Sequence, residues 1–252
     1  MSKTYKIIVA HPDDEIIFFS SILKSASEII FCFSQTQDEV VSLGREKIKN
    51  KLPFKNFFFL DIKEANIFNE ANWRYPKKNY MCLIVNKNQF EYRQNYLTLR
   101  SYLSKIINVG DTIYTHNPWG EYGHEHHVLV FNVIKSLKIK FKLKIFVNNY
   151  VSNKSYNLMK MCKHLLSNIV QYKIIEKKFT NKIKKIYISN FCWTFDDNYI
   201  WPQNEAFIKI NANTIFKCQK KKNFSGALNY LPGNYKINLF KVLLAKIIGY
   251  KQ

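Results

Sequence analysis

The 252-residue sequence lacks the cysteine patterns that are typical of disulfide-bonded domains and of cysteine zinc sites. Its five cysteines are odd in number, widely scattered and free of C-x-x-C spacing, which argues against both a disulfide framework and a cysteine zinc cluster. We therefore expect reduced thiols, most of them serving as small core residues. The positions are Cys32, Cys82, Cys162, Cys192 and Cys218.

Long apolar runs are also missing. None approaches the roughly 20 residues needed to cross a bilayer, and residues 1–5 run straight into the first apolar segment without a secretory leader. No internal repeat, low-complexity linker or sharp change of composition divides the chain. We therefore expect a cytoplasmic protein made of one domain over residues 1–252, with a core over about 4–150 and a C-terminal elaboration over about 151–252.

Acidic residues are scarce, since 39 Lys and Arg face 18 Asp and Glu, and the net charge is +21. Such a charge alone suggests nucleic acid or an anionic surface. Only four of the basic residues are arginines, however, and arginine is the side chain that phosphate recognition prefers. The lysine excess comes with heavy use of Asn, Ile, Phe and Tyr, a pattern typical of a genome rich in A and T. We therefore expect no specific nucleic-acid partner, and an anionic glycan, a sugar nucleotide or a membrane surface stays open.

The last segment, residues 236–251, looks at first like a basic membrane-binding helix. Its lysines are five residues apart, so each step rotates about 140° on a helix and the charges scatter around the axis. They are Lys236, Lys241, Lys246 and Lys251. The spacing gives little support for membrane contact.

The first informative motif is Ala10–Glu15, which reads Ala-His-Pro-Asp-Asp-Glu. The apolar run before it predicts a buried strand over residues 5–10, and the apolar residues after it recur at helical spacing. Pro12 suits the first position of that helix, and three acids would then fill the first turn, where the helix dipole favours negative charge. The acids could simply start a helix, but His11 adds an imidazole at the carboxyl end of a strand, where open α/β sheets place ligands.

A second motif, Gly123–His127, lies more than a hundred residues later. A strand is expected over 111–114, a loop over 115–123 and a helix from about Glu125 to Leu137. His124 and His127 are three residues apart, so both rings project from one helix face while His126 points elsewhere. Two strand-loop-helix elements would thus deliver His11, a carboxylate and a further imidazole to one sheet edge, and this is the ligand number of a catalytic zinc site.

The rest of the chain alternates strands and helices. Strands are expected over 27–34, 56–60, 144–147 and 203–210, and helices over 44–51, 92–107 and 159–185. Residues 61–88 predict a long loop or short hairpin, and residues 191–202 an aromatic loop that could form a pocket wall. The pattern predicts a Rossmann-like α/β fold, a mainly parallel sheet with helices on both faces and a C-terminal elaboration.

The two motifs resemble those of the zinc-dependent N-deacetylases of the LmbE and PIG-L type, which act on N-acetylglucosaminyl and related substrates. The first motif matches in all six residues; in the second, Gly123, His124 and His127 match, while Glu125 and His126 stand where Pro and Asp are usual. The resemblance covers roughly the first 140 residues. It implies one zinc per chain, and ferrous iron also suits two imidazoles and one carboxylate.

Residue by residue, the resemblance implies specific roles. The metal ligands would be His11, Asp14 and His127, with Asp13 as general base. His124 would stabilise or protonate the tetrahedral intermediate, and Tyr122 would assist the oxyanion.

Residues around the motifs complete the expected site. Arg45 would hold substrate hydroxyls or phosphate, although a solvated arginine on a helix face is an equal alternative. Asn117 and Glu121, in the histidine loop, are further candidate substrate-binding residues. Glu15 would orient a ligand or cap the turn. His116 and His164 are expected to be structural or solvent-facing.

The sequence thus predicts a metal-dependent hydrolase that removes acetyl from an N-acetylated amino sugar, whether free, nucleotide-linked or lipid-linked. The alternative is a non-catalytic basic protein that binds nucleic acid or an anionic glycan. Metal content separates the two.

Overall fold

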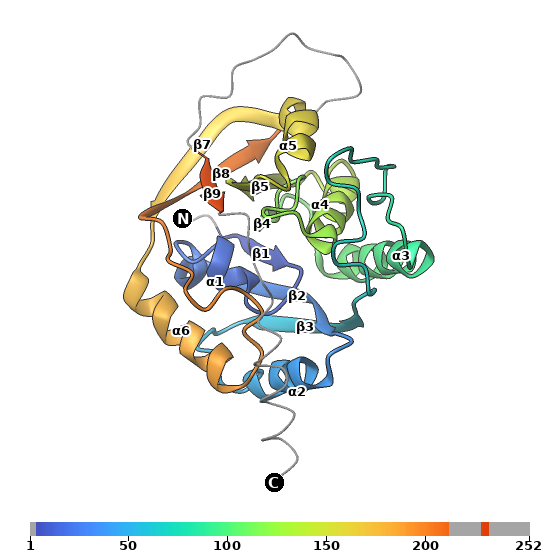
Figure 1. The fold of residues 1–252 in the computed structure, drawn as a ribbon. Coiled ribbons are helices and arrows are strands. Elements are labelled where there is room, and N and C mark those ends of the chain that lie inside the picture. The colour runs from blue at the N-terminus through green and yellow to red at the C-terminus, as the bar shows by residue number, and fades with distance from the viewer. Residues whose placement is uncertain (1–3, 212–227, 232–252) are drawn as a thin grey trace.

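A mixed sheet of seven strands forms the centre of the computed structural model, which describes residues 4–211 and 228–231 (Figure 1). The strand order is β3-β2-β1-β4-β5-β8-β7, and β6 pairs separately with β9. The strands are β1 (Lys6–Val9), β2 (Glu28–Gln35), β3 (Phe57–Lys63), β4 (Thr112–Thr115), β5 (Lys144–Asn148), β6 (Tyr150–Ser152), β7 (Leu166–Ile174), β8 (Asn204–Ile210) and β9 (Asn229–Leu231). The helices are α1 (Asp14–Phe18), α2 (Glu39–Ile48), α3 (Gln89–Ile106), α4 (Glu125–Leu137), α5 (Tyr156–Cys162) and α6 (Lys177–Ser189), with 3-10 turns at Leu23–Ser25 and Lys163–Leu165.

Five of the strands, β3 to β5 in sheet order, run parallel, and β8 joins β5 in the antiparallel sense. The predicted α/β fold with a mainly parallel sheet is therefore confirmed. Because β8 and β7 extend this same sheet, the C-terminal part of the chain is joined to the core by backbone pairing. The sheet places the carboxyl ends of β1 and β4, the strands before the two motifs, side by side.

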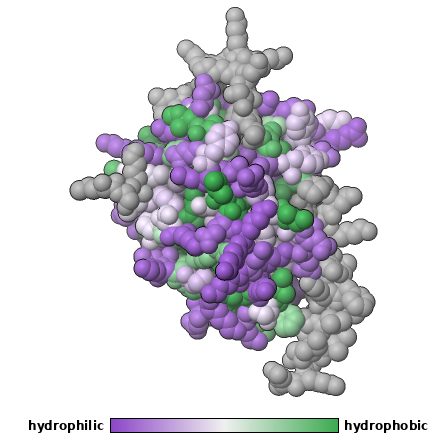
Figure 2. Space-filling view, turned by 90° about the vertical axis from the view of Figure 1, so that its left-hand side faces the viewer, coloured by the Kyte–Doolittle hydropathy of each residue, from purple (hydrophilic) through white to green (hydrophobic). Residues whose placement is uncertain are grey.

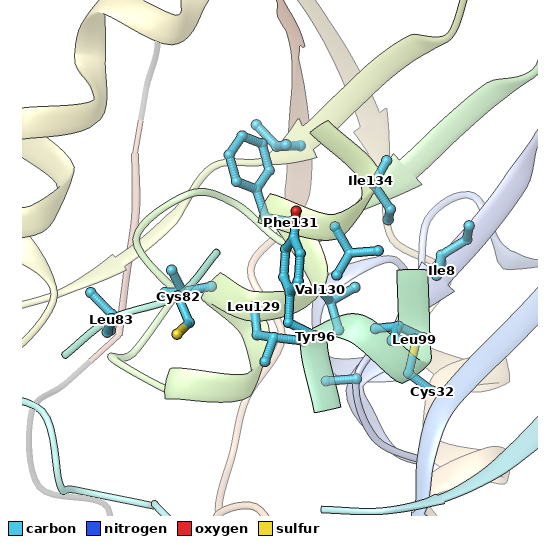
Figure 3. Close-up of a cluster of buried hydrophobic side chains, with 14 of the residues drawn as sticks. Ile8, Cys32, Cys82, Leu83, Tyr96, Leu99, Leu129, Val130, Phe131 and Ile134 are labelled. Atoms are coloured by element: carbon cyan, nitrogen blue, oxygen red, sulfur yellow. The ribbon is translucent and has the colours of Figure 1, made fainter. Parts of the chain in front are cut away.

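Helices cover both faces of the sheet, because successive residues of its central strands point to opposite sides. Ile8 of β1 belongs to a cluster with α3 and α4, whereas Ile7 belongs to a cluster with α1 and α6. Figure 3 shows the first cluster, where Tyr96 and Leu99 of α3 pack near Phe131 of α4. The four described cysteines are buried and unpaired, as predicted, and Cys218 lies outside the described residues.

One predicted element is wrong. The expected helix over 159–185 is interrupted by β7, so that α5 and α6 flank a nine-residue strand. The strand lies at the sheet edge, and Ile169, Tyr172 and Ile174 are exposed on it. An edge strand of this kind lacks the clean alternation that would identify it, and its pairing with β8 decided its structure.

β3 continues to Lys63, and residues 64–88 form an irregular segment with two isolated antiparallel bridges, which agrees with the predicted loop or short hairpin. Within the described ranges, none of the helices has the length and apolar character that crossing a bilayer requires. Figure 2 shows one face of the molecule, on which hydrophilic residues predominate and hydrophobic ones gather in small separate groups. The lysine-containing segment 236–251 lies outside the described residues.

Candidate metal centre

The first motif forms a buried turn between β1 and α1. The backbone of Asp13 has φ 103°, a left-handed conformation that residues other than glycine adopt rarely. The Glu15 carboxylate accepts the N–H of Asp13 at 2.9 Å and the hydroxyl of Tyr187 at 2.7 Å, and its burial raises the pKa of Glu15 to about 8. Glu15 thus holds the turn. Pro12 precedes this turn and is not the first residue of the helix, which corrects the sequence-based prediction.

The loop of the second motif is held from within by Asn117. Its Oδ1 accepts the backbone N–H groups of Trp119 at 3.2 Å and Glu121 at 3.0 Å. Its amide nitrogen donates to Asn148 Oδ1 and to the carbonyl of Tyr150, both at 2.8 Å. Asn117 is fully buried and its polar atoms have internal partners, so its observed role is to shape the loop. Its predicted part in substrate binding stays a prediction.

Glycine is required at the turn before α4. Gly120 has φ +68°, and a Cβ there would lie 2.5 Å from the carbonyl oxygen of His124. The loop can therefore close tightly, and α4 begins at Glu125 as predicted.

The three predicted metal ligands meet where β1 and β4 end. Asp14 lies between the two imidazoles, with Oδ2 at 3.3 Å from His11 Nδ1 and Oδ1 at 3.2 Å from His127 Nε2. Ligand atoms bound tetrahedrally at about 2.1 Å from zinc lie about 3.4 Å from one another. All three side chains are buried. Each of the two separations is close to this value, and a different oxygen of Asp14 faces each ring.

A carboxylate lies against the far nitrogen of each ring, and of the two Glu121 is fully buried and Glu64 partly exposed. Glu121 Oε2 is 2.7 Å from His127 Nδ1, and Glu64 Oε2 is 2.8 Å from His11 Nε2, although this second contact is too bent for a straight hydrogen bond. The hydrogen bond between Glu121 and His127 Nδ1 fixes the tautomer of His127, so the lone pair of its Nε2 faces Asp14. The site thus has the arrangement by which proteins orient metal-binding histidines. Glu121, predicted to bind substrate, is fully buried beneath His127.

Two neighbouring histidines are engaged differently. His124 Nδ1 accepts the backbone N–H of His126 at 3.2 Å, and His116 Nε2 accepts that of Ala10 at 2.8 Å. The pKa of His124 is held well below its usual range, first by burial and then by His127 and His11. His124 is therefore neutral with its proton on Nε2, and it presents a donor to the site. His116 is fully buried, with Nε2 also 3.4 Å from Asp14 Oδ2, and His164 is exposed.

Three trios among the described residues place donor atoms within 4.8 Å of one another, and the predicted set of His11, Asp14 and His127 is not one of them. They are Asp14, His116 and His127; His11, His124 and His127; and a third trio of His11, Glu64 and His126. His126 Nδ1 is 3.8 Å from Glu64 Oε2, and among the described residues neither ring nitrogen of His126 has a hydrogen-bond partner. A neutral imidazole has one lone-pair nitrogen. His11 can therefore serve the third trio through Nε2 or the predicted set with Asp14 through Nδ1, but not both together.

The carboxylate on His127 gives a testable consequence. In a Glu121→Gln protein, the new NH2 group would face His127 Nδ1 and favour the tautomer whose proton lies on Nε2, toward Asp14. We expect metal affinity to fall about 10- to 100-fold, the usual effect of losing such a partner. Competition with a chromophoric chelator measures the change.

Glu125→Gln is the matched control. Glu125 is buried in the same region, but its carboxylate accepts from Trp73 and from the backbone of Ala71 and Asn69, away from the imidazole nitrogens. Equal losses of metal affinity in the two variants would contradict the proposed role of Glu121.

Asp13, the predicted base, is buried beside the ligands. Its Oδ2 accepts both the backbone N–H and the hydroxyl of Thr194, each at 2.8 Å. Burial, followed by the charge of Asp14, raises the pKa of Asp13 to about 7, against the opposing effects of Arg45 and Thr194. The carboxyl group is thus close to the point at which it can both accept and release a proton near neutral pH.

Arg45 and Tyr122 line the same region. Arg45 is 3% exposed, which contradicts the alternative of a solvated arginine on a helix face. Its Nη1 donates to the carbonyl of Phe33 over a long 3.4 Å, and its buried Nε has no hydrogen-bond partner within the described residues. The ring of Tyr122 lies edge-on to the rings of His124 and His127, with centroids at 5.7 and 5.5 Å.

Two residues of the site were missed from the sequence. Glu64 immediately follows β3, and its place at the carboxyl end of a strand could have suggested it. Thr194 lies in the loop after α6, 181 residues from Asp13, and nothing in its local sequence marks it. Trp73 packs in the core beside the site and donates to Glu125.

Fold and site together define an α/β protein with a buried His and Asp cluster suited to a divalent metal. No protein-family model matches the chain. An uncharacterized protein of Acanthamoeba polyphaga mimivirus is 24% identical over 189 residues, which cover 73% of this chain and 80% of the relative.

Among solved structures, the chain is similar to the zinc-inhibited form of teicoplanin deacetylase Orf2, with a TM-score of 0.52. The identity is 8%, and the match covers 84% of this chain and 100% of that chain. At such low identity the likeness shows the fold alone.

Proposed function

We propose that the chain is a cytoplasmic, metal-dependent hydrolase of the LmbE and PIG-L type, which removes acetyl from an N-acetylated amino sugar. The observation that carries this proposal is the placement of Asp14 between two imidazoles whose far nitrogens each lie against a further carboxylate. The fold likeness to a deacetylase and the complete match of Ala10–Glu15 to the family motif support it.

The proposed ligands are His11 Nδ1, the Asp14 carboxylate and His127 Nε2, which suit zinc and also ferrous iron. Zinc bound there would lower the pKa of water from 15.7 to roughly 7 and so provide a nucleophile near neutral pH. The ligand set leaves Asp13 and His124 free for proton transfer and charge stabilisation.

In this proposal Asp13 takes the proton of the attacking water and passes it to the departing amine. His124 donates from Nε2 to the former carbonyl oxygen, because its Nδ1 already accepts the N–H of His126. Tyr122, beside His124, assists the same oxygen. Because His124 and Tyr122 are already held in place, they need little reorganisation during the reaction.

A substrate bound beside Asp13 would also reach Arg45. Its buried guanidinium has a donor unused by the described residues, and it lies close enough to Asp13 and Glu64 to lower the pKa of both carboxyls. We propose that Arg45 donates to hydroxyls or phosphate of the sugar substrate. The carrier of the sugar is left open by this site.

Acetate release tests the proposal. The substrates are N-acetylhexosamines in free, nucleotide-linked and lipid-linked form, with added zinc and with the Asp13→Asn protein as control. We expect release by the parent from at least one class of substrate and a strong reduction in the control. A fully metal-loaded parent that releases no acetate from any of them would overturn the proposal.

The net charge of +21 favours one alternative, a non-catalytic protein that binds an anionic polymer. An open surface hollow of about 480 Å³ is lined in part by Arg74, Lys77 and Lys160. Binding by such a surface would weaken steeply with salt and would tolerate loss of the motif histidines. One bound metal ion per purified chain favours the hydrolase, and a metal-free chain favours the binder.

A further inference from the structure

The loop after α6 folds back over the first motif. It passes α1 in Figure 1, and the indole N–H of Trp201 donates to the carbonyl of Ile16 at 2.6 Å. Tyr187, near the end of α6, donates to Glu15. Thr194 lies between these two anchors, so its position relative to Asp13 is fixed from both sides.

Thr194 contacts Asp13 through two donors. Its backbone N–H and its hydroxyl both donate to Oδ2 of Asp13 at 2.8 Å. Oδ2 therefore accepts two hydrogen bonds from Thr194, and Oδ1 accepts none from that residue.

We propose that Thr194 is a positioning residue that holds Oδ2 of Asp13, so that Oδ1 is the oxygen that receives the proton of the attacking water. This inference rests on the proposed function and deepens it. Rotation of a carboxylate about its terminal bond is broad and nearly two-fold. Two donors on one oxygen remove that freedom, and the reactive oxygen then keeps one direction throughout the reaction.

Of the two donors of Thr194, the hydroxyl is the one that a substitution can remove. Thr194→Val keeps the shape of the side chain and the backbone donor, and it loses one of two hydrogen bonds to a charged group. We expect kcat for acetate release to fall about tenfold, with KM within about twofold of the parent. Thr194→Ser restores the hydroxyl and should restore kcat to within about twofold. Metal content should be unchanged in both.

A double-mutant cycle separates positioning from a general structural effect. If Thr194 acts through the Asp13 carboxylate, Thr194→Val should change kcat by less than about twofold in an Asp13→Asn protein. A structural defect of the loop would lower kcat about tenfold again in that background. An equal, tenfold loss of kcat in the parent and in the Asp13→Asn protein would overturn the inference.

The outcomes distinguish this inference from the proposed function. An active parent whose kcat is unchanged by Thr194→Val overturns the inference and leaves the hydrolase proposal intact. Failure of Thr194→Ser to restore kcat also overturns it. A metal-loaded parent that releases no acetate overturns both.

Discussion

Replacing Asp13 with asparagine is expected to lower kcat for acetate release by about 10²- to 10⁴-fold, the usual contribution of a general base. Asparagine keeps the shape of the side chain and can still accept from Thr194, but its amide cannot take a proton from water. The metal should stay bound, because Asp13 is not one of the proposed ligands. Acetate release and elemental analysis of the same sample measure both properties.

Asp111→Asn is the matched control for this substitution. Asp111 precedes β4, so it lies at the opposite end of that strand from the site, where it pairs with Lys6 at 3.3 Å. The change should leave acetate release within about twofold of the parent, as expected for a surface pair. If Asp13→Asn were as active as Asp111→Asn, the proton acceptor would have to be another group.

The second large effect concerns two adjacent histidines of α4. His127→Ala should abolish metal binding and turnover, because His127 Nε2 faces Asp14. The loss should exceed the 10- to 100-fold that typically follows from removing a partner of a ligand. His126→Ala should keep the metal, because His126 belongs to the third trio, with Glu64. Metal content and affinity, measured side by side, give the comparison.

The two variants are well matched, since both rings are buried and both substitutions leave a cavity of similar size. Melting temperatures of the metal-free proteins would show whether stability differs between them. The reverse result, metal lost with His126→Ala and kept with His127→Ala, would place the ion in the trio of His11, Glu64 and His126 and would refute the proposed ligand set.

Much of the fold and the meeting of the motifs could be predicted because the signals are local. Apolar runs such as residues 5–10 and breakers around Gly120 and Gly123 identify strands and turns within short windows, and parallel strands bring their carboxyl ends to one edge. The start of α4 at Glu125 then followed from the same pattern. His11, Asp14 and His127 come together as those signals predict.

What was missed depends on partners distant in sequence. β7 forms because β8 pairs with it, and Thr194 reaches Asp13 only after the chain has returned over α1. Glu121 was predicted to bind substrate because it lies in the histidine loop, and its contact with His127 is visible only in three dimensions. Sequence spacing identifies side chains that could bind a metal or transfer a proton, but it does not say which of them orient the others through hydrogen bonds.

The return of the chain over α1 also has a consequence for synthesis on the ribosome. Residues 11–15 emerge early, yet Glu15 and Asp13 acquire Tyr187 and Thr194 only after 172 and 181 further residues. Contacts so distant in sequence form late and slowly. A nascent chain that ends near residue 150 would carry the histidines of both motifs without the contacts that shape the acidic turn, so the completed centre is a product of the whole translated length to about Trp201.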